Sequence, residues 1–186
     1  MRRKASVNKS AIRGGTLFLV LLGGCVVALD QWTKQWVRSH IPLGVSWDPI
    51  PWLNRIVTFT HVDNSGAAFG LFPGLSSVFV VIAMVVIVGI FFFYRRMAQS
   101  SWLLLISLGL QLGGATGNLI DRLLRDGRVT DFVDFRVWPV FNVADSAVVI
   151  GTALLAYYAL FVDCPDVADG AEAKAMATVA DGEGAV

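Results

Sequence analysis

The sequence predicts an all-α integral membrane protein with four transmembrane helices and short β-strands in the segments between them. Of 186 residues, 55% are hydrophobic and only 16% are charged, with a mean hydropathy of +0.64. A soluble domain averages roughly 25% charged residues. The apolar residues form blocks that can cross a hydrocarbon core of about 30 Å as helices of roughly 20 residues. Polar and ionisable residues instead crowd the stretch that joins the last two blocks.

The apolar blocks give the predicted order of the chain. We place the spans at about residues 15–33, 75–94, 102–121 and 141–161, within a membrane domain of residues 15–162. Trp32 and Trp36 follow the first span, as expected for an aromatic belt at a membrane interface. Residues 1–14 form a basic tail. Residues 163–186, rich in Ala, Gly, Asp and Glu, are predicted to be disordered.

Two segments between the spans predict β-structure. Residues 55–62 are β-branched and aromatic, which favours a short strand that ends at the turn of residues 64–66. Residues 125–137 indicate a turn followed by a strand, with Asp126 and Gly127 in the turn.

The distribution of Lys and Arg indicates the orientation in the membrane. The basic tail and the pair Arg95 and Arg96 are dense local clusters, which favours both termini in the cytoplasm, although the total counts on the two sides are nearly equal. This orientation puts the polar stretch between Gly113 and Asp145 at the outer face.

Helical spacing groups several of these polar residues at the outer end of the bundle. Residues three or four apart lie on one face of a helix. The pairs are Asp30 with Lys34, Asn118 with Arg122, and Asn142 with Asp145. Ionisable groups at a membrane boundary are costly to desolvate, so the cluster predicts a functional site.

Simpler structural roles are open for many of these residues. Asp30 and Lys34 are either an ion pair at a helix end or a substrate contact, and Asn142 is either a helix N-cap or part of the site. The acids Asp121, Asp126 and Asp134 fit solvated or salt-bridged loop positions. The three glycines of the stretch fit close helix packing better than a phosphate loop; they are Gly113, Gly114 and Gly117.

Other functional classes compete with an enzyme. Acids within membrane helices also line ion or solute pathways, although the chain shows no inverted repeat of the kind found in many transporters. A structural scaffold would need no clustered acids. The stretch Leu22-Gly23-Gly24-Cys25 resembles the lipid-accepting end of a lipoprotein signal peptide, but the apolar run continues through residue 29 and three more spans follow.

The composition gives no indication of nucleic-acid binding, a metal or another cofactor. Net charge is +1, without a basic stripe that contains aromatic residues. Cys25 and Cys164 are too isolated for a zinc site, and we expect Cys25 to be a buried apolar group. His40 and His61 are expected at a wet surface.

Four blocks together resemble the lipoprotein signal peptidase (signal peptidase type II) family over about residues 15–162. They are Asp30-Gln31-x-x-Lys34; Asn64-Ser65-Gly66-Ala67-Ala68-Phe69-Gly70; Gly113-Gly114-Ala115-Thr116-Gly117-Asn118-Leu119-Ile120-Asp121-Arg122 with Val129-Thr130-Asp131-Phe132; and Phe141-Asn142-Val143-Ala144-Asp145-Ser146. Any one block alone is weak, whereas the ordered combination is specific. Thr130 departs from the family pattern, where an aliphatic residue is common.

The resemblance implies a bacterial membrane aspartyl endopeptidase that removes signal peptides from diacylglyceryl-modified prolipoproteins, before the lipidated cysteine. It implies a small extracytoplasmic sheet and a loop helix over the site. Prolipoproteins and membrane lipids are the expected partners of a monomeric enzyme. The resemblance places the catalytic pair on Asp131 and Asp145. The residues expected to bind substrate or support the site are Asn64, Asn118, Arg122, Asn142, Asp30 and Lys34.

The choice of partner for Asp145 depends partly on geometry. Asp131 and Asp134 are three apart, so their side chains face opposite sides of a strand, and only one can face the bundle. The family motif selects Asp131. Asp121 lies on a different helical face from Asn118, and Asp126 lies in the predicted turn.

Overall fold

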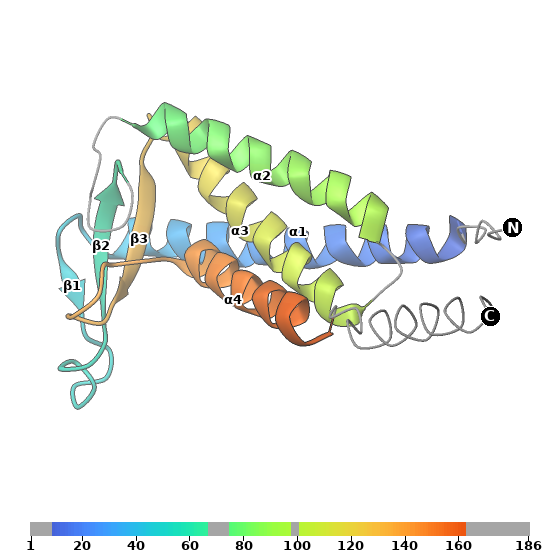
Figure 1. The fold of residues 1–186 in the computed structure, drawn as a ribbon. Coiled ribbons are helices and arrows are strands. Elements are labelled where there is room, and N and C mark those ends of the chain that lie inside the picture. The colour runs from blue at the N-terminus through green and yellow to red at the C-terminus, as the bar shows by residue number, and fades with distance from the viewer. Residues whose placement is uncertain (1–8, 67–74, 98–100, 163–186) are drawn as a thin grey trace, which may run out of the picture. The chain divides into compact units, whose positions relative to one another are not determined.

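The computed structural model describes residues 9–66, 75–97 and 101–162 (Figure 1). Its elements are helix α1 (Lys9–His40), strands β1 (Ser46–Trp47) and β2 (Thr58–Asn64), helices α2 (Ser76–Met97) and α3 (Trp102–Leu124), strand β3 (Val129–Asp134), helix α4 (Val143–Tyr157) and the π-helical turn η2 (Tyr158–Val162). The chain divides into two compact units, residues 1–155 and 156–186. The first contains the candidate site.

Within the described residues, four helical segments are long and apolar enough to cross a membrane, which confirms the predicted number of spans. They are Gly14–His40, Ser76–Tyr94, Trp102–Leu124 and Val143–Val162. The first helix continues well past the predicted end at residue 33. Its last turns bury Val37, which packs with Ile41 and Phe132. This extension therefore packs against the sheet and supports the site.

A small sheet lies at one end of the four helices (Figure 1). Its strand order is β1-β2-β3, and both neighbouring pairs are antiparallel. The sequence predicted strands near β2 and β3 but missed the two-residue β1. Asp126 and Gly127 have φ angles of 51° and 83°, which confirms the turn before β3. No loop helix occurs in residues 41–66. Residues 67–74 lie outside the described part, so that prediction stays untested.

The register of the sheet determines which acid faces the bundle. Val62 is opposite Asp131, and Asn64 is opposite Val129, whereas an irregularity between Phe59 and Val62 shifts the pairing by one residue. Asp131 is 3% exposed. Asp134 is only half-buried and accepts a hydrogen bond from the Thr60 hydroxyl at 2.9 Å. The structure therefore puts Asp131, rather than Asp134, in the interior.

Glycines allow α3 to approach α1 and α4 closely. A Cβ at Gly113 would meet Val26 of α1, and one at Gly117 would lie 2.6 Å from the Asp30 carboxylate. A Cβ at Gly114 would meet the carbonyl oxygen of Ala144 in α4. The packing interpretation of these glycines is confirmed, since each contact leaves no room for a side chain.

Gly114→Ala is expected to lower the free energy of unfolding by about 1–3 kcal/mol, because the added methyl group would push the first turn of α4 away from α3. Gly89→Ala is the matched control. A Cβ at Gly89 in α2 meets no other atom within 4 Å, so alanine there should be neutral or slightly stabilising. Thermal unfolding in one detergent compares the two variants, and equal melting temperatures would contradict the packing argument.

Candidate active site

Asp131 is held from two sides by side-chain amides. Asn142 Nδ2 donates to Asp131 Oδ1 at 2.6 Å, and Asn64 Nδ2 donates to Oδ2 at 2.9 Å. The Asn64 amide is itself oriented, because its Oδ1 accepts a hydrogen bond from Gly66 N at 2.9 Å. Three separate segments thus fix one buried carboxyl group.

Asp145 lies in the first turn of α4, where it forms a reciprocal cap with Asn142. Asn142 Oδ1 accepts from Asp145 N at 2.9 Å, and Asp145 Oδ2 accepts from Asn142 N at 3.2 Å. This is the geometry of a capping box, in which the cap and the third helical residue satisfy each other's N–H groups. Asn142 is therefore both a helix cap and a contact of Asp131.

Asn118 connects the pair to a buried lysine. Its Nδ2 donates to Asp145 Oδ1 at 2.7 Å, while its Oδ1 accepts from Asn142 Nδ2 at 3.1 Å and from Lys34 Nζ at 2.9 Å. An ammonium group has donors only. Lys34 therefore fixes which end of the Asn118 amide faces Asp145.

Lys34 is completely buried between two carboxylates. Its Nζ lies 2.8 Å from Asp30 Oδ2 and 3.3 Å from Asp121 Oδ2. Asp30 Oδ1 also accepts from Ala144 N at 2.9 Å, so a residue of α1 caps the start of α4. Neither Asp30 nor Lys34 lines the pocket described below. Of the two roles considered for Asp30 and Lys34, the structure favours an ion pair that supports the site over a substrate contact.

Asp121 lies outside the lining of the cavity described below and is salt-bridged to Lys34, which agrees with the sequence expectations, but it is buried rather than solvated. It is 1% exposed, and its Oδ2 accepts from Thr130 N at 3.0 Å. Asp121 thereby holds the backbone beside Asp131. The spacing of residues within α3 does not show that α1 covers that face of α3, where Lys34 contacts Asp121. Asp126, in contrast, is exposed.

Two other expectations are wrong. His61 is buried rather than wet, with its Nδ1 at 2.7 Å from the carbonyl oxygen of Ile41. Cys25 is exposed on α1 rather than buried. His40 is exposed, as predicted.

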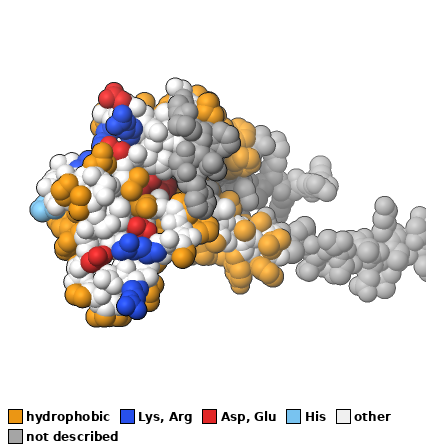
Figure 2. All heavy atoms as spheres, turned by 90° about the vertical axis from the view of Figure 1, so that its left-hand side faces the viewer, with side chains coloured by type: hydrophobic (Ala, Val, Ile, Leu, Met, Phe, Trp, Pro, Cys, Tyr) orange, Lys and Arg blue, Asp and Glu red, His pale blue; other side chains and the backbone are white. Residues whose placement is uncertain are grey.

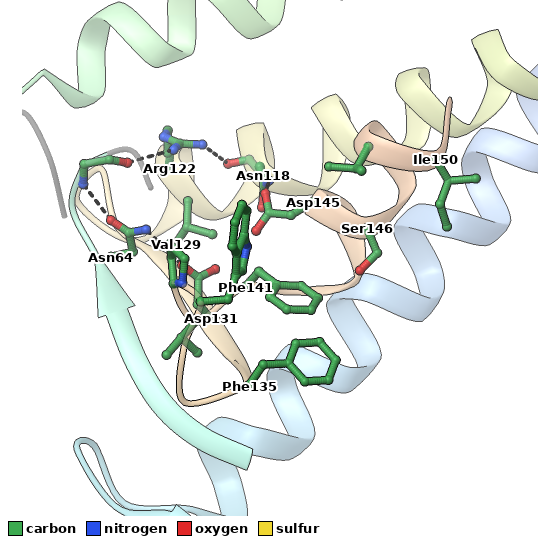
Figure 3. Close-up of a pocket in the computed structure, with 15 residues that line it drawn as sticks. Asn64, Asn118, Arg122, Val129, Asp131, Phe135, Phe141, Asp145, Ser146 and Ile150 are labelled. Carbon is green, nitrogen blue, oxygen red and sulfur yellow. Dashed lines mark hydrogen bonds between the residues drawn. The ribbon is translucent and has the colours of Figure 1, made fainter. Parts of the chain in front are cut away.

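A cavity of about 760 Å³ opens beside both carboxyl groups (Figure 3). Its polar side comprises Asn64, Asn118, Arg122, Asp131 and Asp145. The apolar side is formed by the segment before α4 and by α4 itself, including Trp138, Phe141, Val149 and Ile150. Viewed onto the sheet end, Figure 2 shows acidic and basic side chains gathered among hydrophobic ones. The cavity therefore suits a molecule that is partly polar and partly apolar.

Arg122 lies at the rim of this cavity. Its guanidinium donates to the carbonyl oxygens of Asn118 and Gly66, both at 3.4 Å, and lies 5.2 Å from the centre of the Phe79 ring (Figure 3). These contacts bring α3 together with the segment after β2 and with α2. Arg122 provides the positive charge next to the two carboxyl groups.

The pKa of Asp131 is raised from its ordinary value of 3.8 to about 7. Burial is the main cause, and the negative charge of Asp145 is the second. The amides of Asn64 and Asn142 oppose the shift, because they stabilise the carboxylate form. Like charges in one site resist joint ionisation, so the pair retains a proton near neutral pH.

Two carboxyl groups that face one pocket at the end of membrane-spanning helices define the class of a membrane aspartic peptidase. A model of the signal peptidase (SPase) II family matches residues 22–161. The chain belongs to this family.

Curated relatives and solved structures agree. The chain is 45% identical over 142 residues to the lipoprotein signal peptidase of Halothermothrix orenii, covering 76% of this chain and 93% of that protein. It is 41% identical over 150 residues to the lipoprotein signal peptidase of Geobacillus thermodenitrificans, covering 78% and 91%. A bacterial membrane enzyme solved by the in meso method at 2.3 Å resolution superposes with a TM-score of 0.71 and 33% identity, covering 78% and 88%. The protein is thus a multi-pass bacterial membrane enzyme.

Proposed function

We propose that this protein removes signal peptides from diacylglyceryl-modified prolipoproteins, cutting before the lipidated cysteine, with Asp131 and Asp145 as the catalytic pair. The observation that carries the proposal is the shared amide network, in which Asn142 contacts both acids and Asn118 orients one of them. All of these groups come from one chain, so a single copy supplies the complete proposed catalytic pair.

The two aspartates divide the proton transfers of peptide hydrolysis. Asp145 takes a proton from water as that water attacks the scissile carbonyl carbon. Asp131, whose pKa is raised to about 7, carries the proton and donates it to the carbonyl oxygen. Asp145 then passes the proton it took from water to the departing nitrogen, the C–N bond breaks, and a hydroxyl of the tetrahedral intermediate returns a proton to Asp131.

The remaining residues position these two groups or the substrate. Asn64, Asn118 and Asn142 orient the carboxyl groups through the bonds described above. Arg122 lies on the substrate side of the cavity, where it can contact a peptide carbonyl. Asp30, Lys34 and Asp121 support the start of α4 and the backbone of β3.

The location of the cavity fits a lipid-modified substrate. Asp145 is in the first turn of a membrane-spanning helix, so the pair lies near the membrane surface. With both termini in the cytoplasm, this surface is the outer one. The acyl chains of the diacylglyceryl group would then stay within the outer leaflet, along the apolar side of the cavity.

A cleavage assay tests the proposal. Purified full-length protein is incubated with a diacylglyceryl-modified prolipoprotein, and with the same precursor lacking the lipid. The modified precursor should be shortened, with the lipidated cysteine as its new N-terminus by mass spectrometry. An unchanged modified precursor, or solute flux through proteoliposomes without cleavage, would overturn the assignment.

Activity should not require a metal ion. The aspartate pair supplies both proton transfers itself. Among residues 9–66, 75–97 and 101–162, no group of three or more His, Cys, Asp or Glu side chains is arranged to hold a metal. Dialysis against EDTA should leave the cleavage rate within about twofold of the untreated enzyme. Loss of activity that zinc restores would contradict the aspartate mechanism.

The alkaline side of the pH–rate profile should have its midpoint near pH 7, the raised pKa of Asp131. Above that pH the pair loses its proton and cannot protonate the carbonyl oxygen, so kcat/KM should fall by about tenfold per pH unit. The pKa of Asp131 is about 7 in the folded protein and ordinarily 3.8, so between these two pH values the folded protein binds more protons at Asp131 than the unfolded chain does. The contribution of Asp131 to the free energy of unfolding is therefore lost as the pH rises through 7. Full kcat/KM retained at pH 9 would contradict these roles.

A further inference from the structure

A second cavity, of about 480 Å³, continues from the catalytic pair into the membrane part of the bundle. Its floor is a single stripe along α3, formed by Gln111, Ala115, Asn118 and Arg122. Its walls are side chains of α2 and α4, all apolar except Thr152: Phe79, Ile82, Ala83 and Val86 on one side and Val148, Val149 and Thr152 on the other. Asn118, Arg122 and Asp145 line both cavities, so the two adjoin each other.

Gln111 is the one polar residue deep in the α3 stripe. Its Nε2 is buried and has no hydrogen-bond partner within the described part of the chain. A buried amide donor without a partner is destabilising, and no bulk water is present in hydrocarbon to supply an acceptor. Because Gln111 lines the cavity, a turn of its terminal amide would present this donor to an occupant.

The depth of Gln111 limits what that occupant can be. Gln111 lies seven positions before Asn118, which is about 10 Å along a helix. Lipid ester carbonyls lie near the head groups, so a lipid at the depth of Gln111 would offer only acyl chain, which has no acceptor. A peptide backbone offers a carbonyl oxygen at every residue.

We infer that Gln111 donates a hydrogen bond to a main-chain carbonyl of the substrate's signal segment, on the N-terminal side of the scissile bond. The inference rests on the proposed function and adds a specificity-determining residue to it. Near the scissile bond the substrate must be extended to reach both aspartates, and extended backbone in a membrane leaves carbonyl groups that need donors. At roughly 3.3 Å per residue, the bonded carbonyl belongs to about the third residue before the scissile bond.

A double-mutant cycle tests this contact with the full-length enzyme and synthetic diacylglyceryl-modified precursors. Gln111→Met keeps the length of the side chain and removes the donor. In the substrate, an ester replaces the amide after the second, third or fourth residue before the scissile bond, which weakens that carbonyl as an acceptor. Gln111→Met alone, and the ester at the contacted carbonyl alone, should each lower kcat/KM by about fivefold. The enzyme variant and that ester substrate together should lower kcat/KM no further. Leu110→Met, a neighbour on α3 outside the cavity lining, is the matched control and should retain the wild-type rate.

The melting temperature separates this role from a structural one. Because Gln111 Nε2 has no partner in the free protein, Gln111→Met should melt at the wild-type temperature or above it. A lower melting temperature together with additive losses at all three ester positions would overturn the inference. If the wild-type enzyme is active and the losses are additive, only the Gln111 contact is refuted. If the wild-type enzyme cleaves no precursor, the proposed function is refuted as well.

Discussion

Asp131→Asn and Asp145→Asn should each lower kcat by at least a thousandfold, or about 4 kcal/mol on the activation barrier. Asparagine keeps the shape of the side chain but can neither accept the proton of water nor donate one to a carbonyl oxygen. Asn118, Asn142 and Asn64 would still surround the changed position, so the fold should persist. Initial cleavage rates at matched protein concentration measure the effect.

Two other acids from the same stretch serve as matched controls. Asp126 is exposed in the turn before β3, and Asp134 faces Thr60 on the other side of the strand. Asp126→Asn and Asp134→Asn should stay within about tenfold of wild type, roughly 1.4 kcal/mol. An inactive Asp134→Asn beside an active Asp131→Asn would show that the other face of β3 carries the catalysis.

Lys34→Met should lower the free energy of unfolding by about 3–5 kcal/mol, because it leaves Asp30 and Asp121 buried without their shared cation. It should also slow cleavage, since the Asn118 amide loses the donor that orients it toward Asp145. Unfolding curves in a fixed detergent mixture, together with kcat, measure both effects.

Removing the Asp30 and Asp121 carboxylates as well distinguishes the effect of unpaired buried charges from a simple loss of packing. The triple variant Asp30→Asn, Lys34→Met, Asp121→Asn has the same methionine but no buried carboxylates at these positions. It should recover a large part of the lost stability. Recovery of stability without recovery of kcat would assign Lys34 a separate positioning role, whereas a triple variant no more stable than Lys34→Met would refute the charge argument.

The sequence predicted the features that depend on one element at a time. The number of spans follows from apolar blocks, and the turn at Asp126 follows from its neighbour Gly127. The alternation of a strand explains why Asp131 and Asp134 differ in burial. The family motif was still needed to decide which of the two faces the interior.

Features that depend on two elements were predicted poorly. Helical spacing correctly separated Asp121 from Asn118, but periodicity gives faces relative to one helix and does not say which neighbour covers them. Helix α1 covers the second face, so Asp121 is buried against Lys34. For the same reason, spacing could not show that Asn142 serves both as a cap and as a contact of Asp131.

The cap that Asp30 provides to α4 joins residues 114 positions apart, and this separation has a consequence for biosynthesis. A ribosome delivers α1 early and α4 last, so the amide network around the aspartates cannot close until the fourth helix has been inserted. A partly synthesised chain would contain Asp131 without its partner and could not cleave peptides at this site. Insertion of α4 therefore completes the proposed site.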